Sequence, residues 1–306
     1  MKSIFSISDK LQNHLLLHFI VFLWGFTAIL IALINIDALP MVWMRMSIAT
    51  IILWGYFILT KKSLRITKKQ AIQFLIGGVM IASHWIMFFL SIKTSNVSVT
   101  LVMVSMGAFF AALLEPLFFR RKVRWNEIIL GVSAVLGISI IFNVETEYFW
   151  GIVYGLLASF LSALFSVYNG VNIKDNEPIK MSFYQLFFGV CYITIILSFI
   201  GGFDKKMLEL NVLDWTYLFL LSSFCTAYAF AASIKVLKSL SPFTVMLTIN
   251  LEPVYGIILA LLVFPEKEKM STNFYLGALI VLLSVLFNAF LKNRKQLINS
   301  FKKIKN

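Results

Sequence analysis

The chain has 306 residues, of which 60% are hydrophobic and 13% charged, and its mean hydropathy is +0.88. A soluble domain of this size could not cover so much apolar surface with polar residues, so the composition excludes a soluble protein and indicates an integral membrane protein. A net charge of +13 can point to nucleic acid, but here the basic residues stand in short clusters between apolar runs, which is typical of membrane orientation. Cys191 and Cys225 both lie inside apolar runs, and no disulfide framework, metal site or cofactor is indicated.

Ten apolar runs are long enough to cross a bilayer, because a spanning helix needs about 20 residues. These runs are 15–34, 40–59, 71–92, 97–119, 126–144, 149–172, 179–200, 213–234, 241–264 and 273–291. The first run lacks a small-residue cleavage site after it, so we interpret it as a retained span. The connections are short and no run alternates like a barrel strand, so we predict an all-α polytopic membrane protein with ten transmembrane helices.

Lys and Arg are distributed unevenly between the connections. They are concentrated in residues 61–70, 120–124 and 292–305, which would all lie on the same side of the membrane. The positive-inside rule therefore predicts that the N- and C-termini are both cytoplasmic, in a multi-pass protein of the plasma or inner membrane.

The two halves of the chain resemble each other weakly. The matches that occur in the same order are SIK at 91–93 and 233–235, LG at 130–131 and 276–277, and a proline before a span at 40 and 178. Each match alone could reflect shared apolar composition, but the three together favour a duplication. Because five spans are an odd number, the copies would be inverted, and we predict repeats at 1–147 and 148–306, the second with a basic cytoplasmic tail.

Glu252 is the only charged residue in the run 241–264 and lies near its middle, about 17 Å from the cytoplasmic start of the span. A similar LLEP sequence contains Glu115, but this acid comes near the end of its span. We therefore expect Glu115 to form an interfacial ion pair beside Arg120 and Arg121, with no acid equivalent to Glu252 in the first half.

These features resemble the drug/metabolite transporter superfamily, and within it the EamA family. The residues that carry the resemblance are Trp24-Gly25 in the first span, Glu252-Pro253 in the ninth, Glu266-Lys267 closing that span, and Gly131 and Gly277 in the LG pairs. Pro265 stands where the family usually has glycine, and the fourth span has no central proline. The resemblance implies a secondary carrier with a central cavity shared by both halves, and it does not indicate the substrate.

The candidates for substrate binding or coupling are polar or aromatic residues deep in the spans. They are Trp24, Arg45, His84, Trp85, Gln185, Tyr228, Asn250, Glu252, Pro253 and Tyr255. Glu252 could accept a proton, balance a substrate cation, or form a structural pair with Arg45 or His84. Arg45 could bind a carboxylate or snorkel to the outer interface, and His84 could relay a proton or remain a buried neutral imidazole.

The remaining candidates have equally open roles. Pro253 could form a hinge, a binding notch or a packed kink. Gln185 stands near the position of Arg45 in the inverted repeat, so the two could line opposite ends of one path. The aromatic side chains could stack on a ligand or serve packing alone.

No GxxxxGK[ST], HExxH or GxSxG motif occurs in the chain. We therefore expect neither an ATP-driven pump nor an enzyme, and keep an intramembrane lipid-modifying enzyme or a channel as alternatives.

The sequence predicts a secondary transporter that moves a small metabolite, an amino acid or similar compound, by alternating access. Export rests on the resemblance only. No paired acids suggest a sodium site, so proton coupling or facilitated exchange would drive it. The partners are then the substrate, the bilayer and, if coupled, protons, with no nucleic acid; monomer and homodimer both stay open.

Overall fold

A computed structural model describes residues 2–120, 122, 132–133, 136–141, 146–203, 205–283 and 287, with residues 2–10, 205 and 206 described by their backbone alone. Throughout these residues the regular elements are helices. The first half contains α1 (Lys2–Leu33), α2 (Ala38–Thr60), α3 (Lys68–Thr94), α4 (Val97–Val104) and α5 (Gly107–Phe119). The second half contains α7 (Phe149–Asn172), α8 (Pro178–Ile200), α9 (Val212–Ser222), the π-helix η4 (Ser223–Tyr228), α10 (Ala229–Val236), α11 (Pro242–Ile249) and α12 (Glu252–Val263). Short 3-10 turns are η1 (Thr146–Tyr148), η2 (Ile173–Asp175) and η3 (Lys205–Leu208).

The predicted helical fold is confirmed, with eight helical segments in the described residues long and apolar enough to span a membrane. Three of them are interrupted: α4 and α5 form one span, α9, η4 and α10 another, and α11 and α12 a third. The predicted span 126–144 lies largely outside the described residues, and the span 273–291 is described only through a helix at Thr272–Leu283. The count of ten therefore stays a prediction.

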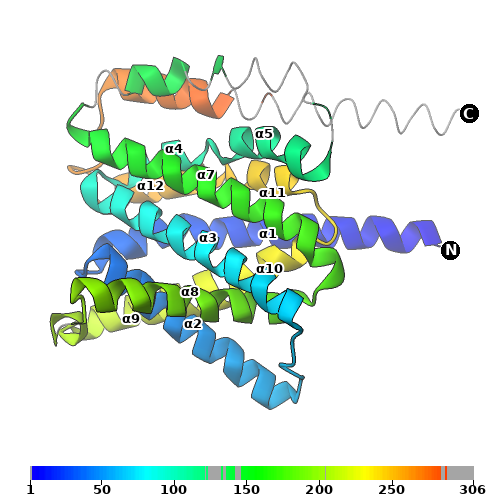
Figure 1. Ribbon diagram of the computed structural model, residues 1–306. Coiled ribbons are helices and arrows are strands. Elements are labelled where there is room, and N and C mark those ends of the chain that lie inside the picture. The colour runs from blue at the N-terminus through cyan, green and yellow to red at the C-terminus, as the bar shows by residue number, and fades with distance from the viewer. Residues whose placement is uncertain are drawn as a thin grey trace, which may run out of the picture.

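The helices pack side by side in a bundle, with α1, α3 and α10 in its middle (Figure 1). In this view α2, α8 and α9 lie below them, and α4, α5, α7, α11 and α12 lie above. The helix α3 packs against α7 and α8 of the second half, and α1 packs against α10 and α12. The core is therefore formed between the two halves, and a cavity inside it is lined by both.

Several helices begin where the sequence provides a capping side chain. The α3 helix starts after Thr67, whose hydroxyl accepts from the amide of Gln70 while the Gln70 side chain accepts from the amide of Thr67. Asn211 and Asp214 form the same reciprocal arrangement at the start of α9. Such caps satisfy amide donors that the first helical turn leaves free, which fixes where each span starts.

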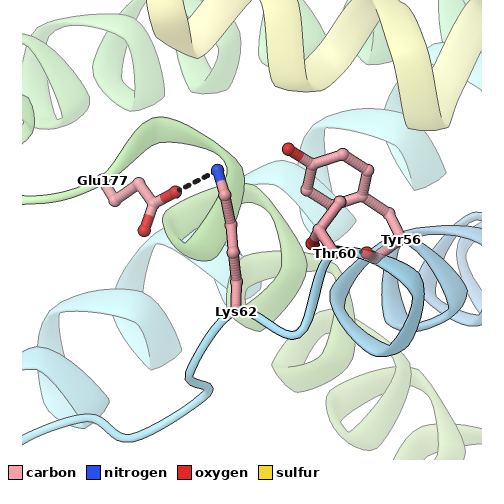
Figure 2. A network of polar contacts seen from close by, with 4 residues as sticks. All are labelled: Tyr56, Thr60, Lys62 and Glu177. Atoms are coloured by element: carbon pink, nitrogen blue, oxygen red, sulfur yellow. Dashed lines mark hydrogen bonds and ion pairs between the residues drawn. The ribbon is translucent and has the colours of Figure 1, made fainter.

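One exposed ion pair joins the two halves outside the helices, as Figure 2 shows. The Nζ atom of Lys62, just after α2, lies 3.1 Å from an oxygen of Glu177, the residue that precedes α8. The same ammonium lies 5.5 Å from the centre of the Tyr56 ring. Contacts with Tyr56 and then with Glu177 raise the pKa of Lys62. Because both charged side chains are well exposed to solvent, this pair adds little to stability.

Candidate functional site

Three spans are irregular at the depth where a carrier would hold its substrate. The chain turns at Ser105–Met106 between α4 and α5, and at Asn250–Leu251 between α11 and α12. The π-helix η4 interrupts the span between α9 and α10. Irregular backbone is tolerated inside a membrane only where protein surrounds it or where it lines a cavity, and broken helices often mark the binding site of a transporter.

A cavity lies among these irregular segments, and both halves of the chain line it. Its lining residues come from eight helices and are Trp24, Thr27, Arg45, Ile81, His84, Trp85, Phe88, Val104, Ser162, Phe165, Ser166, Phe230, Ser233, Leu237, Val245, Met246, Ile249 and Glu252. The space open to the centre of a water molecule is about 80 Å³. One water needs about 10–15 Å³ by this measure, so this central cavity has room for several waters or a small solute.

Arg45 is the cation of the central cavity and is only 1% exposed. Its Nε atom donates to the Thr226 hydroxyl at 2.5 Å, and its guanidinium carbon lies 4.2 Å from the centre of the Trp85 ring. Thr226 belongs to η4, so the π-helix brings this hydroxyl to the guanidinium. The Nη1 atom is buried without a hydrogen-bond partner. A buried donor without a partner is costly, and a ligand carboxylate could supply the acceptor that Nη1 lacks.

Glu252 is the acid of the central cavity and is 6% exposed. It is the first residue of α12, where the aligned amides of the helix favour a negative charge. No hydrogen bond or ion pair joins its carboxylate to Arg45 or His84. The acid and the guanidinium therefore face one cavity without being joined to each other.

Close helix packing fixes the position of Glu252. A Cβ atom at Gly25 of α1 would lie 2.8 Å from Cβ of Tyr255, and one at Gly256 would lie 2.2 Å from a methyl carbon of Leu101 in α4. The missing side chains thus allow α12 to sit tightly between α1 and α4. The close approach of α1 to α12 therefore explains the glycine of the Trp24-Gly25 motif. The contact is with Tyr255, about one helical turn after Glu252.

His84 and Trp24 also line the cavity, and each makes a hydrogen bond to backbone. The Nδ1 atom of His84 lies 2.7 Å from the carbonyl oxygen of Ala158, so Nδ1 carries the proton that is donated there. Trp24 Nε1 donates to the carbonyl of Cys225 at 3.0 Å. The tautomer leaves Nε2 of His84 as the nitrogen able to accept a proton.

The structure brings five of the ten predicted site residues to this cavity and places five outside its lining. Those in the lining are Trp24, Arg45, His84, Trp85 and Glu252. Asn250, Pro253, Tyr255, Gln185 and Tyr228 are outside it. Asn250 is buried at the break before α12, and neither its amide nitrogen nor its amide oxygen has a hydrogen-bond partner.

The other residues outside the lining take part in packing. Gln185 is fully buried and exchanges hydrogen bonds with the Asn169 side chain, so it does not lie opposite Arg45 in one cavity. Tyr228 and Tyr255 make edge contacts with phenylalanines of α1. Pro253 lies in the first turn of α12, where a missing amide hydrogen costs no helical bond. The span is broken before the proline, at Asn250–Leu251.

Several lining residues were not predicted from the sequence. They are small hydroxyl and aromatic side chains: Thr27, Ser162, Phe165, Ser166, Phe230 and Ser233. The Ser166 hydroxyl is buried without a partner, whereas Phe230 packs 5.5 Å from Trp85 and 5.6 Å from Phe165 between ring centres. A serine or phenylalanine in an apolar run has no signal that separates a cavity position from a packed one. Their helical faces could be assigned only once the neighbouring helices were placed.

Glu115 lies near the end of its span as expected, but its surroundings differ from the expected open interface. It is 5% exposed, and its Oε1 atom accepts from the amide of Phe243 at 2.7 Å, at the start of α11. Of the two expected basic neighbours, Arg121 lies outside the described residues. The LLEP acid therefore holds a helix start of the other half, and it does not line the central cavity.

Comparison with known proteins agrees with this architecture. The sequence model of the EamA-like transporter family matches residues 13–143 and again residues 149–290. A solved structure titled "Crystal structure of protein" has a TM-score of 0.65 to this chain at 12% identity, covering 91% of this chain and 97% of its own, which shows a shared fold. A comparison of the sequence with curated proteins finds no match. The family match contains two copies, one in each half.

Proposed function

Because the chain belongs to the EamA-like transporter family of the drug/metabolite transporter superfamily, we propose that it is a secondary carrier for a small zwitterion such as an amino acid. The observation that carries this proposal is that a guanidinium and a carboxyl group line one cavity without being joined to each other. Arg45 offers the unpaired Nη1 donor, and the Glu252 carboxylate makes no ion pair with it. A zwitterion would satisfy both, with its carboxylate on Arg45 and its ammonium on Glu252.

The rest of the cavity favours a small ligand with an apolar side chain. The rings of Trp85, Phe165 and Phe230 form an aromatic wall, and about 80 Å³ open to water centres limits the size of the solute. A substrate that lacks the carboxylate would leave Nη1 of Arg45 buried without a partner, and one that lacks the ammonium would leave Glu252 without one. We therefore expect strong selection against substrates that lack either the ammonium or the carboxylate.

The remaining parts of the proposal follow from the sequence. Ten spans in two inverted repeats, cytoplasmic termini and a place in the plasma or inner membrane agree with the distribution of Lys and Arg. Substrate would move outward by alternating access, with Glu252 exchanging a proton for the substrate ammonium. His84, through Nε2, is the neighbouring group that could pass this proton on.

Counterflow in proteoliposomes tests the proposal. Purified protein is reconstituted with a high internal concentration of one unlabelled amino acid, and the uptake of the same labelled amino acid is followed for each of a set. A carrier predicts saturable uptake that internal substrate stimulates. Flux that neither saturates nor responds to internal substrate would indicate a channel, and conversion of the solute without transport would indicate an enzyme.

A further inference from the structure

Two of the three interrupted spans, α4–α5 in the first half and α11–α12 in the second, contact each other through glutamates. In each contact, a glutamate near the end of one span binds the first helical turn of the other. Glu268, which follows α12, accepts the amide of Val97 on one carboxylate oxygen and the amide of Ser98 on the other, each at 2.9 Å. Glu115, near the end of α5, accepts the amide of Phe243 at 2.7 Å. Val97 begins α4, and Phe243 is the second residue of α11. Each span therefore begins against an acid from near the end of the other.

These two contacts lie at opposite ends of the bundle. The contact of Glu268 is at the start of the span Val97–Phe119, and the contact of Glu115 is near the end of the same span, which is long enough to cross a membrane. By the distribution of Lys and Arg, the first lies on the outer face and the second on the cytoplasmic face. We call the contact of Glu268 with Val97 and Ser98 the outer latch, and that of Glu115 with Phe243 the inner latch.

The outer latch lies beside a second cavity. This outer cavity has about 400 Å³ open to water centres and is lined by Ala32, Ile92, Lys93, Ser95, Asn96, Val97, Tyr148, Phe264, Glu266, Lys267, Glu268 and Lys269. Four of the helices that line the central cavity, α1, α3, α4 and α12, lead towards it at the end where α4 begins. The two cavities are therefore neighbouring compartments along the same helices, and residues of the outer latch form part of the outer wall.

We propose that the two latches are the gates of alternating access, so that breaking the outer latch opens the central cavity to the outer cavity and breaking the inner latch opens it to the cytoplasm. The proposal rests on the carrier function proposed above. Each acid is almost fully buried, with Glu268 at 2% and Glu115 at 5% exposed, so neither contact is an incidental surface pair. When α4 or α11 swings away, its amide donors exchange the carboxylate for water, which makes the contact reversible.

The two latches differ in the number of amide donors at the first two positions of the helix that is held. The first residue of α4 is Val97, which has an amide hydrogen, whereas the first residue of α11 is Pro242, which has none. Glu268 therefore holds two amides of the first two residues of its partner helix, and Glu115 can hold only one of the corresponding pair.

Labelling a cysteine in the central cavity from each side tests this inference. The reporter is Ser166→Cys in a background with Cys191→Ser and Cys225→Ser, and a membrane-impermeant thiosulfonate is applied to right-side-out and to inside-out vesicles. Glu268→Gln is expected to raise outside labelling about tenfold, the effect of losing about one charge-assisted hydrogen bond, and to lower inside labelling. Glu115→Gln is expected to do the reverse. Glu209→Gln and Glu177→Gln, which replace exposed acids outside both cavities, serve as matched controls.

Two proline exchanges test the same gates without altering either acid. Val97→Pro removes one donor of the outer latch, and the extended backbone of Asn96 before it, at φ −152° and ψ −179°, suits a residue that precedes proline. Pro242→Ala restores a donor to the inner latch. We expect Val97→Pro to raise outside labelling and Pro242→Ala to lower inside labelling, even if an acid variant fails to fold.

Unchanged labelling in folded variants, or an equal rise on both sides, would overturn the gate inference and leave the acids as ordinary helix caps. Because labelling needs no substrate, this result is independent of whether transport is found. Failure to detect counterflow would in turn count against the carrier function without affecting the labelling result.

Discussion

The spans α4–α5 and α11–α12 use the same backbone arrangement but differ in chemistry. Each consists of a short first helix of 8 residues, a turn, and a longer second helix, of 13 residues in α5 and 12 in α12. At the turn of the first span the chain reads Ser105-Met106-Gly107, without an acid, whereas the second helix of the other span begins with Glu252. The interruption therefore belongs to the shared architecture, and the charge is a feature of one half alone.

This difference separates what the fold needs from what the function needs. The break between α4 and α5 forms without a proline at the turn, so Pro253 is not required to interrupt a span of this kind. Glu252, in contrast, has no counterpart in the first half and gains no hydrogen bond or ion pair from Arg45 or His84. A buried acid without such compensation is costly. It is expected at a site where a ligand or a proton provides the compensation.

The largest expected effect is the loss of transport on Glu252→Gln. The amide has nearly the same shape but can neither bind a proton nor balance an ammonium, so we expect at least about a tenfold loss of transport rate. The pH dependence of transport should also become flatter. Initial rates in proteoliposomes between pH 5 and 9 measure both, with Glu209→Gln as the control for a charge lost from an exposed position. Wild-type rates at every pH would contradict a role of Glu252 in coupling.

Arg45→Lys is expected to weaken transport by a similar factor, but only for substrates that carry a carboxylate. Lysine keeps the positive charge, yet it lacks the planar group that donates to Thr226, stacks on Trp85 and would bind the proposed carboxylate. We expect the half-saturating concentration to rise about tenfold or more for substrates with a carboxylate. Kinetics with an amino acid and with its amide derivative check this. A loss that is equal for both compounds would mean that Arg45 does not bind the carboxylate.

Pro253→Ala should have a much smaller effect. The turn between α4 and α5 shows that the break does not depend on proline, and the first helical turn tolerates either residue. We expect transport to stay within about threefold of the wild type, since only local backbone entropy changes. A loss as large as that of Glu252→Gln would show that the proline, and not the acid, distinguishes α11–α12 from α4–α5.

The smallest effect is expected at the exposed ion pair of Lys62 and Glu177. The pKa of Lys62 is raised, so its stabilising contribution is present below the usual pKa of lysine and is lost as pH rises through the higher value. Because the pair is solvent-exposed, Lys62→Met should leave transport within about twofold of the wild type. Melting temperatures at pH 8 and pH 11, with Lys61→Met as the neighbouring control, check the sign. A large loss of transport would mean that the contact between the halves is functional.

The sequence was sufficient for the fold class because membrane spans are determined by long apolar runs and by the distribution of Lys and Arg. Residue counting along the helices also indicated that Glu252, Arg45 and His84 could share one layer, and all three line the central cavity. It could not assign Gln185 and Tyr228 to a side of their helices, because depth does not give the face of the helix. Gln185 points to Asn169 and Tyr228 to Phe19, so neither reaches the cavity.

The roles of the other acids could not be predicted for a related reason. Glu115 and Glu268 bind amides at the starts of helices from the other half, more than a hundred residues away in the chain. The sequence pattern drew attention to Glu266-Lys267, but the buried acid is Glu268, two residues further on. Which acid of a charged loop is buried depends on how the neighbouring helix starts are packed, and local composition does not contain that information.

Counterflow of labelled amino acids in proteoliposomes tests the central claim most directly, when the wild type, Glu252→Gln and Glu209→Gln are compared at equal reconstitution. We predict saturable uptake, stimulated by internal substrate, for the wild type and Glu209→Gln, and a loss of at least about tenfold for Glu252→Gln. The claim would be contradicted if no zwitterion showed such stimulation with the folded wild type. Uptake by Glu252→Gln equal to that of the wild type would contradict it as well.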